Sequence, residues 1–426
     1  MRFSSSISDA TDIDEALDHV AEALRDGIHD DVHDDVHDDV HDDVDGDDDG
    51  DDDVDIDVAV VFATGHHVER FDRIHEVIKR ALRPRFILAA TCQGVIGARR
   101  EIEQGPGLCA LAGAMAGATL EPLRCAPGQK GSSAIRLEAR AVADGEAVAE
   151  PPHAIVLVGD PFSTPQQETI ESLSEAFPGT PVVGGMASGA RQPGGNRLML
   201  NGTTHDDGAI GLAIGGAIEL RPTVSQGCRA IGRPLVITRA SHNIVQELGG
   251  RSALEVAQEV IQQADEHDRR LVAAHALFVG RVIDEYKERF GRGDFLIRNI
   301  VGADQEKGYL ALGDPHIRVG QTIQFHVRDG ATATEDFSLL LEAQRLHHPA
   351  AGLLFSCNGR GTNMFGRSHA DAQIIDQALG DVPLAGFFAM GEFGPVGDHN
   401  HIHGHTASLL VFHEQGGGAG SAGVGG

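Results

Sequence analysis

Two short segments that lie far apart in the chain contain the same set of chemically useful residues. They read Ser225-Gln-Gly-Cys-Arg229 and Ser356-Cys-Asn-Gly-Arg-Gly361. Glycine lets the backbone come close to a bound molecule, and arginine offers a planar fork of donors that suits a carboxylate or a phosphate. The pattern therefore indicates a receptor for a small molecule first, and an enzyme only second.

A third glycine-rich corner, which runs from Phe387 to Pro395, contributes the acid Glu392. An arginine for the carboxylate and Glu392 for the ammonium group would recognise a zwitterion such as an amino acid. We therefore predict that Arg229, Arg360 and Glu392 contact the ligand. The alternative for either arginine is an ordinary ion pair at the surface.

The cysteines allow a second, catalytic interpretation. Cys228 and Cys357 are candidate nucleophiles if a histidine lies beside either of them, which would make the protein a thiol-dependent enzyme. A small buried thiol is the commoner role for cysteine, so we predict no catalytic residue. The five cysteines form no C-x-x-C pair and their number is odd, which is typical of reduced thiols in the cytoplasm.

Motifs for common cofactors and metals are missing from the sequence. It has no P-loop, Rossmann glycine motif, nucleophile elbow or H-E-x-x-H pair. Residues 398–405 place four histidines on alternate positions, which would share one face of a strand as metal ligands do. Because no spaced cysteine or carboxylate accompanies them, we expect an exposed start of a strand, and predict neither a metal nor a cofactor.

Composition excludes several classes of partner. The chain has 426 residues, 41% of them hydrophobic but only 4% aromatic, and a net charge of -30. Few aromatic side chains and a strongly negative charge argue against nucleic acid and anionic membranes as partners. Residues 1–10 lack the basic and apolar parts of a signal peptide, and no apolar run approaches the roughly 18 residues of a membrane span. We predict a soluble cytoplasmic protein of two or three domains.

An acidic tract interrupts the first helix-to-strand connection. Four His-Asp-Asp-Val units in residues 29–44 are followed by a run of aspartate and glycine. The spacing of Asp45, Asp47 and Asp49 matches the start of a calcium loop, but the twelfth position is Ile56 instead of glutamate. If helical, the repeated histidines could instead bind zinc or nickel. We favour a low-complexity, disordered insert over residues 28–57, and a disordered tail over 415–426.

Hydrophobic periodicity predicts a mixed α/β chain with two lobes of mixed sheet flanked by helices. A ligand cleft is expected between or beneath the glycine corners of the lobes. Helices are expected over 13–24, 71–82, 165–177, 242–248, 252–263 and 333–346. Strands are expected over 58–62, 86–90, 134–142, 154–158, 198–200, 209–214, 235–238, 271–279, 295–300, 308–312 and 322–328.

Several longer motifs together resemble the FIST family, named for F-box and intracellular signal transduction proteins. The main ones are Ala90–Gly97, Val182–Gly189, Val224–Pro234, Leu353–Gly361 and Gly386–Val396. The resemblance implies a FIST N-like domain over 1–27 and 58–250 and a FIST C-like domain over 251–414. The candidate ligand-binding residues come from these motifs: Cys92, Ser188, Ser225, Gln226, Cys228, Arg229, Ser356, Cys357, Asn358, Arg360 and Glu392.

The resemblance also implies a sensory unit that binds small ligands such as amino acids. Some relatives bind haem and sense nitric oxide, and others are adaptors in ubiquitin ligases. The sequence has no F-box-like extension, kinase or receiver domain, so its output is expected to pass through a separate signalling protein. We therefore predict a cytoplasmic small-ligand sensor that is not an enzyme. The alternatives are a haem-binding gas sensor with a histidine as axial ligand, a thiol enzyme using Cys357, and a protein-interaction scaffold.

Overall fold

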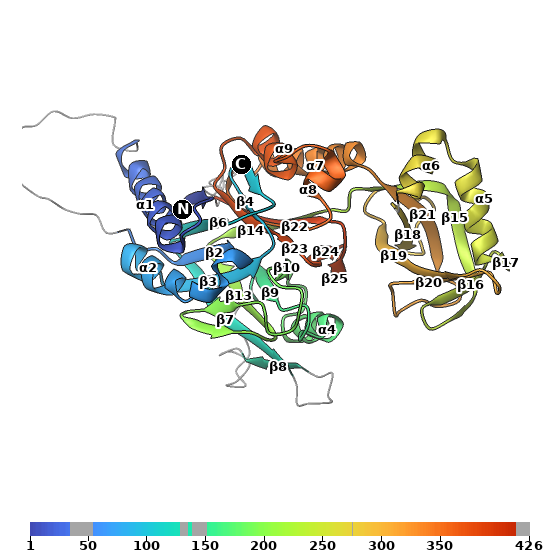
Figure 1. Ribbon diagram of the computed structural model, residues 1–426, viewed down its shortest axis with the longest axis horizontal. Coiled ribbons are helices and arrows are strands. Elements are labelled where there is room, and N and C mark those ends of the chain that lie inside the picture. The colour runs from blue at the N-terminus through green and yellow to red at the C-terminus, as the bar shows by residue number, and fades with distance from the viewer. Residues whose placement is uncertain (35–53, 128–134, 139–150, 275, 415–426) are drawn as a thin grey trace, which may run out of the picture.

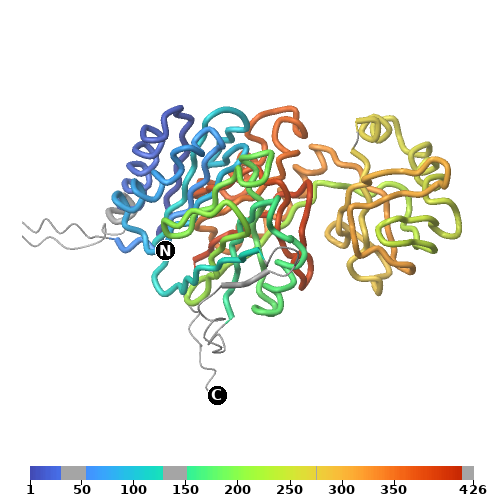
Figure 2. Tube along the Cα trace, turned by 60° about the horizontal axis from the view of Figure 1, so that its bottom comes forward, coloured from blue at the N-terminus to red at the C-terminus, as the bar shows by residue number. Residues whose placement is uncertain are grey.

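A large lobe of sheets and helices is joined to a smaller β-barrel by two segments of chain (Figures 1 and 2). The computed structural model describes residues 1–34, 54–127, 135–138, 151–274 and 276–414. The expected disordered segments fall largely on residues 35–53 and 415–426, which lie outside the described residues. Residues 28–34 continue the first helix instead of belonging to a loop.

The first sheet of the lobe is built around a parallel pair, β2 and β3, whose residues are almost all buried. Burial on both faces explains why β2 is a continuous apolar run. Helix α1 packs Leu17, Val20 and Leu24 against this sheet. The strand order is β1 (Arg2–Ser8), β6 (Leu108–Ala114), β2 (Val58–Thr64), β3 (Phe86–Cys92), β11 (Leu198–Leu200) and β12 (Thr203–His205); the helices are α1 (Ile13–Asp34), η1 (Gly65–Arg70) and α2 (Arg73–Leu82).

The other two sheets of the lobe repeat this arrangement. The second contains β25 (His399–His403), β24 (Glu392–Val396), β10 (Val182–Met186), β9 (Ala154–Gly159), β13 (Ala209–Gly216), β7 (Ala118–Pro127) and β8 (Ile135–Glu138), with α4 (Gln166–Ala176). The third contains β14 (Glu219–Ser225), β26 (Ala407–His413), β22 (Pro349–Cys357), β23 (Leu384–Ala389), β4 (Val95–Gly97) and β5 (Arg100–Ile102), with α7 (Gly330–Arg345), α8 (Gly361–Phe365) and α9 (Ala370–Leu379).

The three sheets share one topology, so the described lobe consists of three structural units. The orders β1-β6-β2-β3, β7-β13-β9-β10 and β14-β26-β22-β23 each place a parallel pair beside the last strand of the unit. Each unit also gives a hairpin to a neighbour. Hairpin β4–β5 extends the sheet of β23, β24–β25 extends that of β10, and β11–β12 extends that of β3. The exchange is therefore cyclic.

Backbone hydrogen bonds fix the register of the three units. The bond that follows the central strand recurs in all three, from Thr64 N to Gly107 O, Asp160 N to Gly208 O and Cys357 N to Thr406 O, each at 2.8 Å. The bond that joins each exchanged hairpin to its neighbour also recurs, from Thr91 N to Arg197 O, Met186 N to Gly391 O and Phe388 N to Gly94 O. Equivalent residues in the units can therefore be compared directly.

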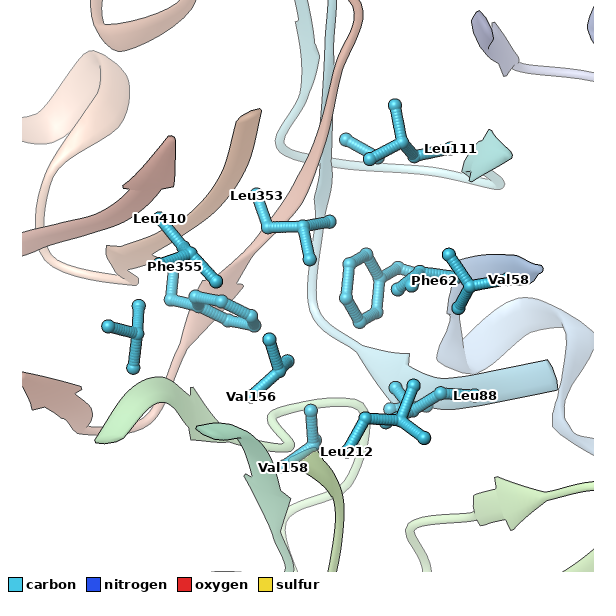
Figure 3. Packing of buried hydrophobic residues seen from close by; sticks show 14 of the residues in the cluster. Val58, Phe62, Leu88, Leu111, Val156, Val158, Leu212, Leu353, Phe355 and Leu410 are labelled. Atoms are coloured by element: carbon cyan, nitrogen blue, oxygen red, sulfur yellow. The ribbon is translucent and has the colours of Figure 1, made fainter. Parts of the chain in front are cut away.

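A single apolar core lies between the three sheets (Figure 3). The equivalent positions Phe62, Val158 and Phe355 of the three central strands all contribute to it. The rings of Phe62 and Phe355 lie 6.0 Å apart in an edge-to-face arrangement. Burial of such a side chain contributes roughly 1.5–3 kcal/mol to the free energy of unfolding, so this core holds the units together.

The smaller body is a closed β-barrel with its own apolar core. The chain enters it from β14 and leaves it into α7, so the barrel is inserted between the first strand and first helix of the third unit. Its strands are β15 (Cys228–Ser241), β21 (Thr322–Arg328), β18 (Leu277–Val282), β19 (Phe295–Asp304), β20 (Tyr309–Leu312) and β16 (Ile244–Leu248), followed by short β17 (Arg251–Ser252); its helices are α5 (Ala253–Gln263) and α6 (Glu266–Ala273).

The predicted mixed α/β class is confirmed, but the second body is a barrel instead of a second helix-flanked lobe. Two element predictions in the barrel were wrong. A helix was predicted over 242–248, but residues 244–248 form strand β16, because His242 adopts a left-handed conformation (φ 53°) that turns the chain back onto β15. A strand was predicted over 271–279, but residues 266–273 form helix α6, which is capped by Asp265, and strand β18 begins only at Leu277.

Candidate functional site

The two Ser/Cys/Arg corners meet at one edge of the third sheet. Strands β14 and β22 lie on either side of β26, and both Ser225 and Ser356 pair with Ala407. Both strands are antiparallel to β26, so they run in the same direction and end at the same edge. The sheet register thus brings together two corners that the barrel insertion separates in sequence.

Arg360 is almost completely buried, with 1% of its surface exposed. Its Nε and Nη2 atoms donate to the two carboxylate oxygens of Asp371 at 2.9 and 2.7 Å, and Ser356 donates to the same carboxylate at 2.6 Å. The remaining nitrogen, Nη1, has no hydrogen-bond partner among the described residues. It faces the first corner, since a Cβ at Gly227 would lie only 3.0 Å from it.

Glu392 is also fully buried. Its Oε2 atom accepts hydrogen bonds from the backbone and hydroxyl of Thr406, at 3.1 and 2.7 Å. The other oxygen, Oε1, has no partner in the described part of the chain. Burial raises the pKa of Glu392 to about 8, although nearby Arg360 favours the charged form. The carboxyl group is therefore mostly protonated at neutral pH.

The other two units show that the fold does not need an acid at this position. The hairpin register makes Glu392 equivalent to Val95 and Leu198, which are both buried apolar residues. A buried carboxyl group with an unsatisfied oxygen lowers stability. Such a group, together with a perturbed pKa, is typical of functional sites.

The thiols of the two corners are not activated. Burial raises the pKa of Cys228 and that of Cys357 to about 12. The Sγ atom of Cys357 accepts a hydrogen bond from the backbone of Gly359 at 3.4 Å. Because the thiolate is the nucleophile, neither side chain is prepared for nucleophilic attack at neutral pH.

Arg229 anchors the barrel to the lobe. Its guanidinium forms an ion pair with Asp268 of helix α6 and donates through Nε to Asp329 at 3.0 Å. Asp329 is the N-cap of α7 and accepts from the backbone of Thr332 at 2.7 Å. Two carboxylates thus engage the fork of Arg229, which links helix α6 of the barrel to helix α7, the first helix of the third unit.

A cavity of about 240 Å³ opens beside the first corner, at the junction of barrel and lobe. Gln226 fixes one wall, because its amide donates to Phe295 O at 2.7 Å and accepts from Ile297 N at 3.2 Å on strand β19. Arg229, Arg292 and Asp336 supply charge around the cavity. Its apolar wall consists of Val224, Phe290, Phe295, Ile297 and Leu340.

Three predicted site residues lie elsewhere. Cys92 is buried at the end of β3 and donates to Ala63 O at 3.4 Å. Ser188 accepts from Gln93 N at 2.9 Å and donates to Phe388 O, so it connects all three units. Asn358 lines a second cavity, which shares no lining residue with the first.

The alternate histidines make hydrogen bonds within the protein. His403 bonds Gly394 O at 3.0 Å, and His405 bonds Asn299 Oδ1 at 2.9 Å and also contacts Arg328. Burial lowers the pKa of His403 to about 3 and that of His405 to about 4. Among the described residues, no three His, Cys, Asp or Glu side chains are grouped to hold a metal ion. Every helix described is too short or too polar to cross a membrane.

Comparison with known families assigns both parts of the chain. Residues 57–251 match the family model described as the FIST N domain, and residues 253–395 match the FIST C domain. The chain belongs to the FIST family. An uncharacterized protein of Mycobacterium tuberculosis is 37% identical to this FIST protein over 357 residues, which cover 83% of this chain and 90% of the relative. An uncharacterized protein of Mycobacterium bovis is 37% identical over 361 residues, with the same coverage.

The matched FIST ranges meet inside the barrel. The FIST N range ends with β15 and β16, while the FIST C range begins at α5 and continues through the rest of the barrel. Both ranges also contribute strands to the third sheet. The candidate site of this FIST protein therefore requires residues from both ranges.

The sequence missed the acids that organise the site. Asp371 and Asp336 hold the two serines of the corners, and Asp268 pairs with Arg229. Asp329 has a local signal, because an aspartate before Gly330 and an apolar periodic segment is typical of an N-cap. No local sequence signal marks the other three acids, Asp268, Asp336 and Asp371. Their partners depend on how helices pack on the third sheet and on the barrel.

Proposed function

We propose that this FIST protein is a sensory protein of signal transduction that binds an amino acid in the cavity between lobe and barrel. The observation that supports this most directly is the placement of opposite charges around one small cavity with an apolar wall. Asp336 suits an ammonium group, and Arg292 and Arg229 suit a carboxylate. From the corners we predicted an arginine for the carboxylate and Glu392 for the ammonium group. In the proposed site, Asp336 takes the place of Glu392 as the acid that binds the ammonium group.

Arg292 is the arginine best able to bind the carboxylate. It is 41% exposed and its ion pair with exposed Glu335, at 2.7 Å, contributes little to stability and can be exchanged for a ligand. The guanidinium of Arg229 is already paired with two aspartates. Arg229 therefore contributes positive electrostatic potential to the cavity but no free donors for a carboxylate. The side chain of the amino acid would pack against Phe290 and Phe295.

The size of the cavity favours a small metabolite over haem. At about 240 Å³ it lies below the usual range for drug-sized ligands and is too small for a porphyrin. The proposed role is binding and not catalysis, because the nearby thiols of Cys228 and Cys357 are protonated at neutral pH. These points support an amino acid sensor over a haem-binding gas sensor and over a thiol-dependent enzyme.

The position of the cavity suggests how binding is transmitted. Its walls come from β14 and α7 of the lobe and from β15 and β19 of the barrel. A ligand that contacts both bodies stabilises one relative orientation of them over others. We propose that a separate signalling protein recognises this orientation.

Isothermal titration calorimetry with the common amino acids tests the proposal. We expect at least one to bind the wild-type protein, and at least tenfold weaker binding by Asp336→Asn and Arg292→Ala. The matched control is Arg251→Ala, which removes an exposed ion pair with Glu259 at the far end of the barrel. The absence of heat with every amino acid, or equal affinity in all four proteins, would contradict the proposal, and a Soret band in the purified protein would favour haem.

A further inference from the structure

A second cavity, of about 660 Å³, lies where the first and third units of the lobe meet. The exchanged hairpin β4–β5 forms one wall, and the segment from Asn358 to His369 forms another. The lining contains three carboxylates, from Asp9, Glu101 and Glu103, but only one guanidinium, from Arg100. It shares no residue with the junction cavity that we propose for the amino acid.

Two of the three carboxylates already have partners. Asp9 forms an ion pair with Arg100, so these two charges balance each other. Glu103 accepts hydrogen bonds from the backbone nitrogen of Thr362, at 2.9 and 3.1 Å, and from its hydroxyl at 2.6 Å. Because these two carboxylates have partners within the protein, neither of them indicates a ligand.

Glu101 differs from both. Only 4% of its surface is exposed, and one oxygen, Oε1, accepts from the backbone of Ala372 at 2.9 Å. The other oxygen, Oε2, has no hydrogen-bond partner within the described ranges of the chain. Burial and the nearby charge of Asp371 raise the pKa of Glu101 to about 7. A buried acceptor without a donor is costly, so this oxygen calls for a partner from outside the protein.

The positions equivalent to Glu101 in the other two units carry no ionisable group. The hairpin registers make it equivalent to Ile402 in the third unit and Thr204 in the second, neither of which ionises. The hairpin exchange that places Glu101 beside α9 is common to all three units. The carboxyl group is therefore an addition to the first hairpin and not a requirement of the exchange.

The neighbouring groups suit a cation. His369 accepts a hydrogen bond from the backbone nitrogen of Glu101 at 3.0 Å through Nδ1. The residue is held in a left-handed conformation (φ 60°), which a side chain other than glycine adopts only under constraint. Amide side chains of Gln93, Gln104 and Asn358 also line the cavity and offer further acceptors.

We propose that this cavity binds a small organic amine, whose ammonium group donates a hydrogen bond to Oε2 of Glu101. An ammonium group has three donors and no acceptor, which matches a carboxylate surrounded by amide oxygens. A divalent metal fits less well, since such ions require about six or more oxygen ligands and the described residues contain no suitable cluster of metal-binding side chains. An amino acid also fits less well, because Asp9 already engages Arg100.

Calorimetry at pH 8 with 1,4-diaminobutane as the probe tests this site, with 1,4-butanediol as a neutral probe of equal length. We expect the diamine to bind the wild type and the diol not to bind. Glu101→Gln keeps an oxygen for the backbone of Ala372 but lacks the charge, and should weaken diamine binding at least tenfold. Affinity for the wild type should also fall about tenfold from pH 8 to pH 6, as Glu101 is protonated.

The matched control is Glu175→Gln, which removes one negative charge from an exposed position on α4 and should leave affinity unchanged. Asn358→Leu, which leaves the buried carboxylate in place but removes a lining amide, should also weaken binding and serves as a second variant. Equal binding of diamine by wild type and Glu101→Gln, equal binding of diamine and diol, or no binding by the wild type would overturn the proposal. None of these results affects the test of the amino acid site.

Discussion

Four buried polar side chains of the first and third units affect one another electrostatically. The negative charge of Asp371 raises the pKa of Glu101, and Asp371 accepts hydrogen bonds from the guanidinium of Arg360. The positive charge of Arg360 in turn favours the charged form of Glu392. The four side chains run from Glu101, which lines the second cavity, to Glu392 in the third glycine-rich corner. The two glutamates stand where the other units have residues that do not ionise, so the added chemistry is concentrated at the contact of the first and third units.

Glu392 should make stability depend on pH in a defined window. Its pKa is raised from 4.5 to about 8 in the folded protein, so between these values the folded state holds a proton that the unfolded state lacks. The free energy of unfolding contributed by this group therefore falls as pH rises, by at most about 1.4 kcal/mol per pH unit. Glu392→Gln removes this contribution, so the variant should gain stability relative to the wild type from pH 5 to pH 8.

Urea denaturation of both proteins across this range measures the difference. The buried histidines, whose pKa values are lowered, destabilise both proteins as pH falls below 6.5, and their contribution cancels in the comparison. Glu168→Gln, on the first turn of α4, is a suitable control and should show a difference independent of pH. A constant difference between Glu392→Gln and wild type would contradict the assigned protonation state.

At the scale of single residues, sequence reasoning found the corners but not their partners. The types and spacing of Ser356, Cys357 and Arg360 singled out a segment that meets the other corner at one edge of the third sheet. The sequence could not show that Asp371 fills the fork of Arg360, because that contact depends on where α9 packs. Nor could it show that Arg229 is paired with two aspartates, which lie on α6 and at the N-cap of α7.

At the scale of elements, close backbone packing in the parallel pairs explains one glycine in particular. Gly386 lies on β23 between β22 and the exchanged strand β4. A Cβ atom there would overlap the carbonyl oxygen of Leu354 on β22. The backbone of Leu354 is held on its other side by β26 and cannot move away without loss of sheet hydrogen bonds.

Gly386→Ala should therefore destabilise the protein although it adds only one methyl group. We expect a loss of at least ~1–3 kcal/mol in the free energy of unfolding, the usual cost of overpacking a core. Gly302→Ala on β19 is the control, since its added Cβ would lie 3.9 Å from the nearest atom outside its chain neighbours. Thermal unfolding followed by circular dichroism compares the two, and equal melting temperatures would show that the strand pair tolerates the methyl group.

Most elements of the lobe could be predicted, but their pairing could not. Apolar runs such as 58–62 and 154–158 are strong signals of buried strands, and both are strands in the structure. The cyclic exchange of hairpins joins residues far apart in sequence, as when β4 pairs with β23. The three units share one topology, but equivalent residues can be as different as Val95, Leu198 and Glu392. Hydrophobic periodicity alone therefore could not reveal that the lobe repeats one unit three times.

At the scale of the whole molecule, the barrel is an insertion with closely spaced ends. Cys228 and Arg328 are ladder partners at the start of β15 and the end of β21, about 5 Å apart as antiparallel partners are. The lobe and the barrel have separate apolar cores. The boundary between the two FIST ranges, near residue 252, instead cuts through the barrel and separates strands of the third sheet.

Removal of the barrel at its own ends should therefore leave a folded lobe. A variant in which two glycines replace residues 228–328 joins Gly227 to Asp329 and keeps every strand of the three sheets. Separate expression of residues 1–251 and 252–426 serves as the comparison, because it divides the third sheet and leaves the shared core incomplete. We expect the barrel-free variant to be monodisperse in size-exclusion chromatography and to unfold cooperatively, and the two halves to aggregate. Cooperative folding of either half alone would instead show that the hairpin exchange is dispensable.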